Sequence, residues 1–363
     1  MSSVEPQRAG PSAWTADAVA RFATAVGAHL GVDAYGPALR VGGPRLPDGP
    51  AVSPLADVGL LTVTGDDAAR FLHAQITNDV EHLMPGEARW GGYCTAKGRL
   101  QSTFRYWRDP GAGSLRLAVA RPLASALARR LAMFVLRAKA RVADASDAYA
   151  TFGLLDASVA EAAADAFGIS VPAADGSSVT EGGAHLVGLP PLPGAANRPR
   201  WLLVVPEADA ARAWSALRSA AEPLDAPAWR RTEVLAGIPR IVAGTWEQFV
   251  PQMLNFESVD GVNFRKGCYP GQEVVARSQY LGKLKRRMFA AHGRGPEPEP
   301  GSDVVPAAGG EPSGQVVLAA PDGDGGFDLL FESQVAAVEA GMLLAGGAPL
   351  QLRPLPYALK AID

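Results

Sequence analysis

The sequence contains little cysteine, no long apolar run and no strong excess of either charge. Its 363 residues include only two cysteines, Cys94 and Cys268, which are too few for a disulfide framework, so a reducing cytoplasm is the expected location. No run of about 18 uncharged apolar residues occurs, and a membrane span is therefore not expected. Residues 1–8 lack a basic segment followed by an apolar one, so no signal peptide is predicted. A net charge of -3 argues against a general coat for nucleic acid.

Histidine is also sparse and scattered, which bears on metal binding. No histidine has a cysteine or a second histidine at ligand spacing, and Cys268 has no other thiol nearby in the sequence. A metal site is therefore not predicted, and a complete iron-sulfur site within this one chain is not expected. The five histidines are His29, His73, His82, His185 and His292.

The composition and the spacing of apolar residues are typical of a globular protein with mixed secondary structure. With 48% hydrophobic and 20% charged residues, the chain is long enough for about two or three domains. Residues 1–54 are rich in Ala, Gly and Pro and are expected to be peripheral, with one helix at 15–30. Strands alternate with helices across 151–220, which favours a small α+β sandwich. After Arg287, short apolar runs separated by Gly and Pro predict a small antiparallel barrel or sheet.

Two neighbouring strands are predicted at residues 90–95 and 100–107. The second alternates apolar and polar residues, so we expect it to be half-buried. Cys94 lies inside the first strand and is interpreted as a core residue. Lys97 and Arg99 flank the glycine of the connecting turn, where they either contact a carboxylate or form a solvated hairpin tip.

The most informative stretch runs from residue 264 to 287 and contains Cys268. Lys266 precedes the thiol, and Pro270-Gly271 predicts a turn that exposes its side chains. Cationic neighbours favour thiolate over thiol, which predicts a reactive cysteine, and the alternative is a small buried residue in a tight turn. The stretch has seven basic residues against one acid, Glu273, which suits an anionic partner. The basic residues are Arg265, Lys266, Arg277, Lys283, Lys285, Arg286 and Arg287.

Residues 266–273 read Lys-Gly-Cys-Tyr-Pro-Gly-Gln-Glu and resemble the signature of the YgfZ family. Members of that family are similar in fold to the aminomethyltransferase of the glycine cleavage system. The resemblance implies an α+β fold of three domains in a cloverleaf, with a C-terminal antiparallel β-barrel. It also implies a tetrahydrofolate-binding accessory protein that supports assembly or repair of iron-sulfur enzymes, including a radical-SAM tRNA methylthiotransferase. Cys268 would be the functional thiol, with Lys266 beside it.

The resemblance also implies a division of the chain into parts, with one domain inserted into another. The parts are an N-terminal segment at 1–54, a folate-binding core at 55–147 plus 229–287, an inserted α+β domain at 148–228, and the barrel at 288–363.

Further family elements supply candidate folate-binding residues. Residues 75–80 resemble a Thr-Asn-Asp element and contain Asn78, although a plain turn at a helix end is the alternative. Trp229 matches a tryptophan implicated in the folate pocket, where an indole face stacks on a ring of the ligand, and the alternative is a core tryptophan. The other candidates are Tyr269, Gln272, Glu273 and Arg277.

One position departs from the family pattern. Other members carry Glu immediately before an Ala-Gly pair, where this chain has Leu235. Glu233 lies two residues earlier and is expected to point elsewhere on its helix.

Two other functions are weighed against the accessory role. A folate-dependent aminomethyltransferase would need an acid in the strand after the turn at 96–99, and residues 100–104 contain none. Direct RNA binding by residues 283–287 is not expected, because no aromatic residues alternate with the basic ones. These observations favour the accessory protein, with the transferase as the alternative.

Overall fold

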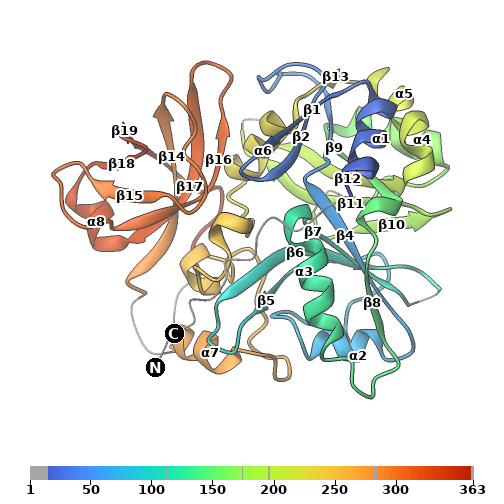
Figure 1. The fold of residues 1–363 in the computed structure, drawn as a ribbon, viewed down its shortest axis with the longest axis horizontal. Coiled ribbons are helices and arrows are strands. Elements are labelled where there is room, and N and C mark those ends of the chain that lie inside the picture. The colour runs from blue at the N-terminus through green and yellow to red at the C-terminus, as the bar shows by residue number, and fades with distance from the viewer. Residues whose placement is uncertain (1–14, 112, 174, 195–196, 281–283, 361–363) are drawn as a thin grey trace.

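Four β-sheets organise the protein in the computed structural model, which describes residues 15–111, 113–173, 175–194, 197–280 and 284–360 (Figure 1). Two large sheets lie face to face, and helices cover their outer faces. A third large sheet forms a separate lobe at the C-terminal end. Within the described part of the chain, no helix is long and apolar enough to cross a membrane.

The first large sheet is five-stranded, antiparallel and ordered β5-β6-β7-β4-β8. Successive side chains point to opposite faces, so Leu61 and Val63 of β4 pack against the helices α2 and α3, while Leu60 faces the second sheet. The elements are β4 Val58–Thr64, α2 Ala68–His73, β5 Ala88–Cys94, β6 Leu100–Arg108, β7 Leu115–Ala120, α3 Arg121–Ala132 and β8 Arg141–Asp144.

The second large sheet is six-stranded, with the order β10-β11-β12-β9-β3-β13. Its outer face is covered by α1, α4 and α5, whose buried residues share one apolar cluster with the strands. The elements are α1 Ala16–Val26, β3 Ala51–Pro54, β9 Tyr149–Leu155, α4 Ala157–Phe167, β10 Ser178–Glu181, β11 Ala184–Leu192, β12 Arg198–Pro206, α5 Ala210–Arg218 and β13 Glu222–Pro223.

The N-terminal segment is part of this second layer, in contrast to the peripheral position expected for it. The apolar stripe of α1 is buried. Its Phe22 ring packs edge-on against the Phe152 ring, with 5.4 Å between the ring centres. Strand β3 is hydrogen-bonded to β9 in antiparallel register. Only β1 His29–Asp33 and β2 Gly36–Arg40 form a small sheet of their own.

Strand β6 is buried on both faces, so the half-buried strand expected from its alternation is wrong. Its polar residues Gln101, Thr103 and Arg105 are each less than one-tenth exposed. The reason is the second sheet, because Trp107 of β6 shares a core with Leu155 and other residues of that sheet. Alternate residues of β6 therefore face two different buried environments, rather than the core on one side and water on the other.

The C-terminal lobe is a nearly closed, antiparallel, barrel-like sheet of seven strands, which confirms the predicted barrel (Figure 1). Its strands run in the order β19-β18-β15-β16-β17-β14-β20. They are β14 Arg286–Arg294, β15 Asp303–Pro306, β16 Gly314–Pro321, β17 Gly326–Gln334, β18 Leu343–Ala345, β19 Ala348–Pro349 and β20 Gln351–Arg353, with α8 at Val335–Ala340.

Two helices connect the layers with the barrel, and short 3₁₀ turns complete the connections. Helix α6, Ala226–Leu235, packs against β16 and β17 of the barrel and against the second sheet. Helix α7, Gln272–Tyr280, follows the cysteine turn. The 3₁₀ helices are η1 Ser146–Ala148, η2 Glu207–Asp209, η3 Ala243–Thr245 and η4 Pro251–Leu254.

Candidate functional site

The cysteine signature forms a turn that packs against the β5–β6 hairpin. A Cβ atom on Gly271 would lie 2.4 Å from the Thr95 carbonyl oxygen, and Gly271 has a φ of +82°. Gly98 of the hairpin lies against Gly271 and has a φ of +71°. Both the close approach and the left-handed backbone therefore require glycine. Cys268 lies on this turn with an exposed free thiol.

Lys266 of the signature points inward, toward the C-terminal end of α2. Its ammonium donates hydrogen bonds to the carbonyl oxygens of His73 and of Ile76, the latter at 2.8 Å. It also lies 4.8 Å from the centre of the Tyr269 ring. Burial lowers the pKa of Lys266 to about 8, an effect that the nearby Asp79 opposes. Lys266 thus ties the cysteine turn to the first sheet.

Asn78 is buried and holds two backbone segments together. Its amide nitrogen donates to the carbonyl oxygens of Trp90 at 2.8 Å and of Asp260 at 2.7 Å. The neighbouring Thr77 hydroxyl donates to the Gly261 carbonyl at 2.6 Å. The Thr-Asn-Asp element therefore positions the loop that leads into the cysteine turn.

The other candidate folate-binding residues lie in two separate places. Trp229 is 2% exposed and packs in the core between the two large sheets. Tyr269 is buried below the cysteine turn. On α7, Gln272 is half-buried, and Glu273 and Arg277 are exposed. The structure does not bring Trp229 together with the cysteine turn, and a role of these residues in folate binding stays a prediction.

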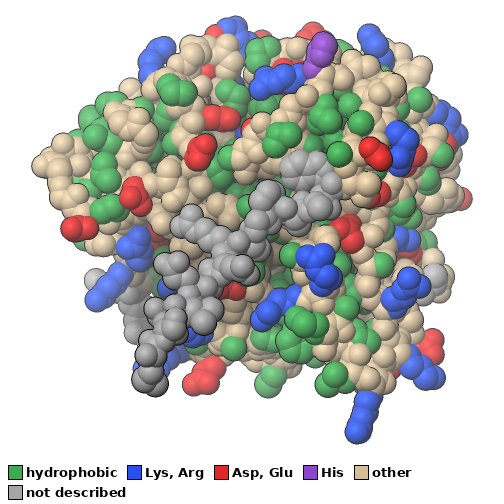
Figure 2. Space-filling model, viewed as in Figure 1, with side chains coloured by type: hydrophobic (Ala, Val, Ile, Leu, Met, Phe, Trp, Pro, Cys, Tyr) green, Lys and Arg blue, Asp and Glu red, His purple; other side chains and the backbone are tan. Residues whose placement is uncertain are grey.

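The basic stretch from 265 to 287 is not one continuous exposed patch, and its suitability for an anionic partner stays a prediction. Arg286 pairs with Glu332 at 2.9 Å, and the buried Arg287 pairs with Glu257. Lys283 lies outside the described residues. On the face shown in Figure 2, Lys and Arg side chains are interspersed with Asp and Glu rather than gathered.

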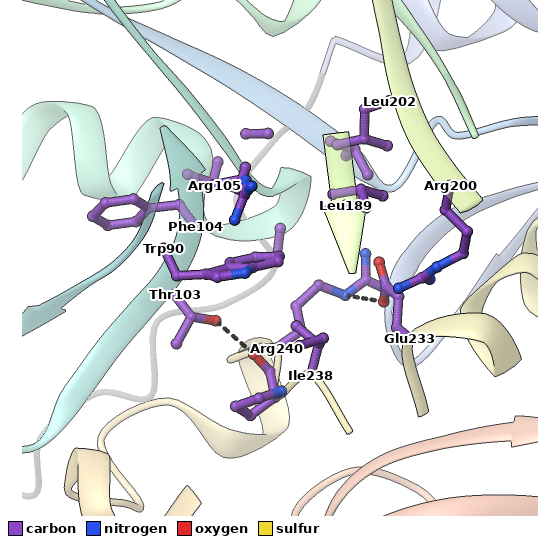
Figure 3. Close-up of a pocket in the computed structure, with 15 residues that line it drawn as sticks. Trp90, Thr103, Phe104, Arg105, Leu189, Arg200, Leu202, Glu233, Ile238 and Arg240 are labelled. Carbon is purple, nitrogen blue, oxygen red and sulfur yellow. Dashed lines mark hydrogen bonds and ion pairs between the residues drawn. The ribbon is translucent and has the colours of Figure 1, made fainter. Parts of the chain in front are cut away.

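A small inner cavity of about 50 Å³ lies where the two large sheets and α6 meet (Figure 3). Trp90 of β5, Thr103 and Arg105 of β6, and Glu233 of α6 point toward it. Apolar side chains supply most of the remaining surface. These further lining residues are Val58, Phe104, Ala118, Val119, Ala120, Leu189, Arg200, Leu202, Ile238, Pro239 and Arg240.

Several buried polar atoms around the inner cavity lack a hydrogen bond within the described part of the chain. Trp90 Nε1, Arg105 Nε, Glu233 Oε2 and Arg240 Nε are buried without a hydrogen-bond partner among the described residues. Glu233 and Arg240 form an ion pair at 3.4 Å, but no hydrogen bond joins them. Burial raises the pKa of Glu233 above its usual value. Because buried polar groups are normally satisfied, this cluster calls for water or a ligand.

Sequence reasoning missed the residues of this cavity. Glu233 was expected to point elsewhere than position 235, and it does, because its carboxylate faces the inner cavity while Leu235 lines a separate pocket beside the barrel. The sequence offered one signal for Glu233: it is an acid in a helix whose other side chains are largely buried. Trp90 and Arg105 carried no local signal, because their role depends on the second sheet covering theirs.

An outer groove of about 780 Å³ adjoins the inner cavity, and Trp90 and Arg105 line both. Its volume lies in the range of small-molecule sites, about 300–1,000 Å³. The groove carries charges of both signs. Its other lining residues are Asn78, Asp79, His82, Glu87, Ala88, Arg89, Asp175, Gly176, Val259, Asp260, Val262, Asn263, Phe264, Arg265 and Lys360.

Metal-binding side chains do not gather in the described part of the protein. No group of three or more His, Cys, Asp or Glu residues that could hold a metal ion occurs there. Cys94 of β5 is buried, as expected, in an apolar cluster that it shares with residues of the barrel such as Met288 and Val317.

Comparison with known proteins identifies the family. No family model matches the chain. The tRNA-modifying protein YgfZ of Klebsiella pneumoniae (strain 342) is 30% identical over 327 residues, which cover 87% of this chain and 97% of that protein. The chain belongs to the YgfZ family. The YgfZ protein of Escherichia coli O127:H6 is also 30% identical, over 87% of this chain and 98% of its own length.

The fold expected from the family signature is confirmed as well. The structure matches the glycine cleavage system aminomethyltransferase T of Bartonella henselae with a TM-score of 0.68, over 95% of this chain and 99% of the other. At 15% sequence identity, this likeness shows the fold alone. The chain is therefore a YgfZ family member with the aminomethyltransferase fold.

Proposed function

We propose that this YgfZ family member is a cytoplasmic, tetrahydrofolate-binding accessory protein that supports assembly or repair of iron-sulfur enzymes. A radical-SAM tRNA methylthiotransferase is the client we propose first. The name of its relatives, tRNA-modifying protein, supports a role in tRNA modification. The observation that carries folate binding is the set of buried polar atoms without a hydrogen bond around the inner cavity, next to a groove of ligand size.

The residues around the inner cavity and groove fit the chemistry of a folate. The carboxylate of Glu233 is suited to accept N–H groups of a pterin ring, and Trp90 offers an aromatic face. The outer groove contains Arg89, Arg265 and Lys360, which suit an anionic glutamate tail. When bound, tetrahydrofolate supplies a carrier for one-carbon units.

Cys268 acts at a different place in this proposal. It lines neither the inner cavity nor the outer groove, and its thiol is exposed on the turn. A surface thiol can reach a partner protein, whereas the inner cavity is closed to one. We therefore assign Cys268 to the client and the inner cavity to the folate, with Lys266 holding the turn in place.

The strand next to the inner cavity supports the accessory role over the aminomethyltransferase. The β6 residues that line the cavity are Thr103, Phe104 and Arg105, and none is an acid. A transferase of this kind needs a carboxylate on that strand to handle a proton near the folate nitrogen. Among the lining residues, Glu233 of α6 is the sole carboxylate, and it is paired with Arg240.

Folate binding is tested by titration calorimetry with 5-formyltetrahydrofolate. Glu233→Gln should weaken binding about tenfold or more, because a charged hydrogen bond in a buried site is worth about 1.5–3 kcal/mol. Glu339→Gln, an exposed acid on α8, is the matched control and should bind like the wild type. Glu273→Gln tests the sequence-based candidate on α7 in the same experiment. Wild-type protein that binds no reduced folate would refute this part of the proposal.

The client role is tested by tRNA methylthiolation in cells that lack their own family member. The wild-type chain should restore the modification, and Cys268→Ser should not. Equal restoration by both would keep the pathway and make the thiol dispensable. Failure of both, with normal expression, would favour the folate-dependent transferase.

A further inference from the structure

Two side chains separate the inner cavity from the outer groove. Trp90 and Arg105 line both spaces, and the Arg105 guanidinium carbon lies 5.1 Å from the centre of the Trp90 ring (Figure 3). The inner cavity, at about 50 Å³, has room for a few water molecules, whereas the groove has about 780 Å³. A ring that enters from the groove to reach Glu233 must therefore displace one of these two side chains.

An internal ion pair holds Arg105 in this position. Its Nη2 atom lies 2.9 Å from Oδ1 of Asp175. The Arg105 side chain is 3% exposed and that of Asp175 is 48% exposed. Asp175 itself lies on an anchored segment, because the Ala88 amide donates to the carbonyl of Gly176 at 3.0 Å. The pair thus joins a buried cation to an acid that is already half in water.

Two other cations of the groove are also paired with carboxylates, although neither cation is as buried as Arg105. Arg89 pairs with Glu87 at 2.6 Å, and Lys360 pairs with Asp260 at 2.5 Å. Internal carboxylates therefore already pair with three of the four Lys and Arg side chains that line the groove, and among the described residues Arg265 has no carboxylate partner. Only the Arg105 pair lies at the passage to the inner cavity.

Separating Arg105 from Asp175 has a different free-energy cost for each of the two side chains. A buried guanidinium without a partner is strongly unfavourable, because it has lost its hydration. A half-exposed carboxylate can return to water at little cost. Exchange of one carboxylate for another on Arg105 is therefore favoured over simple opening of the pair.

We propose that Asp175 is an internal substitute for a carboxylate of the ligand, which displaces it from Arg105 on binding. Resting on the proposed folate function, this makes the glutamate tail the competing group. Release of Asp175 frees Arg105 to move with the tail and opens the passage beside Trp90. The exchange makes Arg105 a residue that selects ligands with an anionic tail.

The test compares folate with pteroate, which lacks the glutamate tail, by titration calorimetry. Asp175→Asn should raise the affinity for folate about fivefold, because it removes a competitor worth about 1 kcal/mol, and should change the affinity for pteroate much less. Asp147→Asn is the matched control. It removes a 43% exposed acid paired at 2.6 Å with the 6% exposed Arg121, outside the groove, and should change neither affinity.

Two outcomes would overturn the exchange. One is an unchanged folate affinity in Asp175→Asn, and the other is an equal gain for folate and pteroate. If wild-type protein binds neither compound, the proposed folate function fails, and 4-aminobenzoylglutamate then decides the exchange on its own. That probe should raise the melting temperature of Asp175→Asn more than that of Asp147→Asn, and equal shifts would refute the proposal.

Discussion

Replacing Lys266 by Met should alter the pH dependence of stability. Burial lowers the pKa of Lys266 from 10.5 to about 8 in the folded protein. Between these values the unfolded chain holds a proton that the folded protein has released, so the contribution of this group to stability rises with pH. This contribution is complete above the pKa of Lys266 in the unfolded chain. It is lost as the pH falls through the pKa of Lys266 in the folded protein. The full difference corresponds to about 3 kcal/mol, and a Met at this position does not titrate.

Urea unfolding of the wild type and of Lys266→Met measures this directly. The difference in unfolding free energy should grow in favour of the wild type by about 2–3 kcal/mol between about pH 7.5 and about pH 10. Other groups that titrate in this range contribute to both proteins and cancel in the difference. Lys285→Met removes an exposed lysine of the same stretch and should leave the wild-type slope unchanged. A difference that stays constant across this range would show that burial does not shift the pKa of Lys266.

Two further predictions concern the packing around the cysteine turn. Gly271→Ala should destabilise the protein by more than the 1–2 kcal/mol or so of a left-handed alanine, because its Cβ would lie 2.4 Å from the Thr95 carbonyl oxygen. Gly111 has a φ of +80° and open space around it, so Gly111→Ala should lose only the stability that a left-handed alanine costs. If thermal unfolding shows the same loss of stability for both variants, the predicted clash at Gly271 is contradicted. Asn78→Leu should lower the free energy of unfolding in urea by about 2 kcal/mol, because two carbonyl oxygens lose their hydrogen-bond donor. A decrease below about 0.5 kcal/mol would mean that water replaces the amide of Asn78.

Local sequence patterns predicted helices and strands well where a single neighbouring layer determines which side chains are buried. Helix α4, at 157–167, lies in the region 151–220 where strands were expected to alternate with helices, and Gly168 ends it in the left-handed conformation with a φ of +66°. The barrel strands follow the apolar runs after Arg287 for the same reason. In each case the signal and its cause lie within a few residues of one another.

The candidate site was predictable only in part, because its cavity is made by distant segments. The signature identified the family and the exposed position of Cys268, yet it says nothing about the inner cavity. Glu233 lines the same cavity as Trp90 and Arg105 only because α6 packs beside the second sheet, and no spacing within the sequence encodes that placement. The burial of Arg105 likewise depends on a second sheet that covers β6.

The position of β3 in the six-stranded sheet has a consequence for synthesis of the chain. Strand β3 at 51–54 pairs with β9, which begins at residue 149, about 100 residues later. At roughly 5–20 residues per second, the ribosome needs about 5–20 seconds to make the partner of β3. During that interval β3 has an unpaired edge and the apolar stripe of α1 has no sheet to cover. Protection of the nascent N-terminal segment by a chaperone would therefore matter more for this chain than the stability of the finished fold suggests.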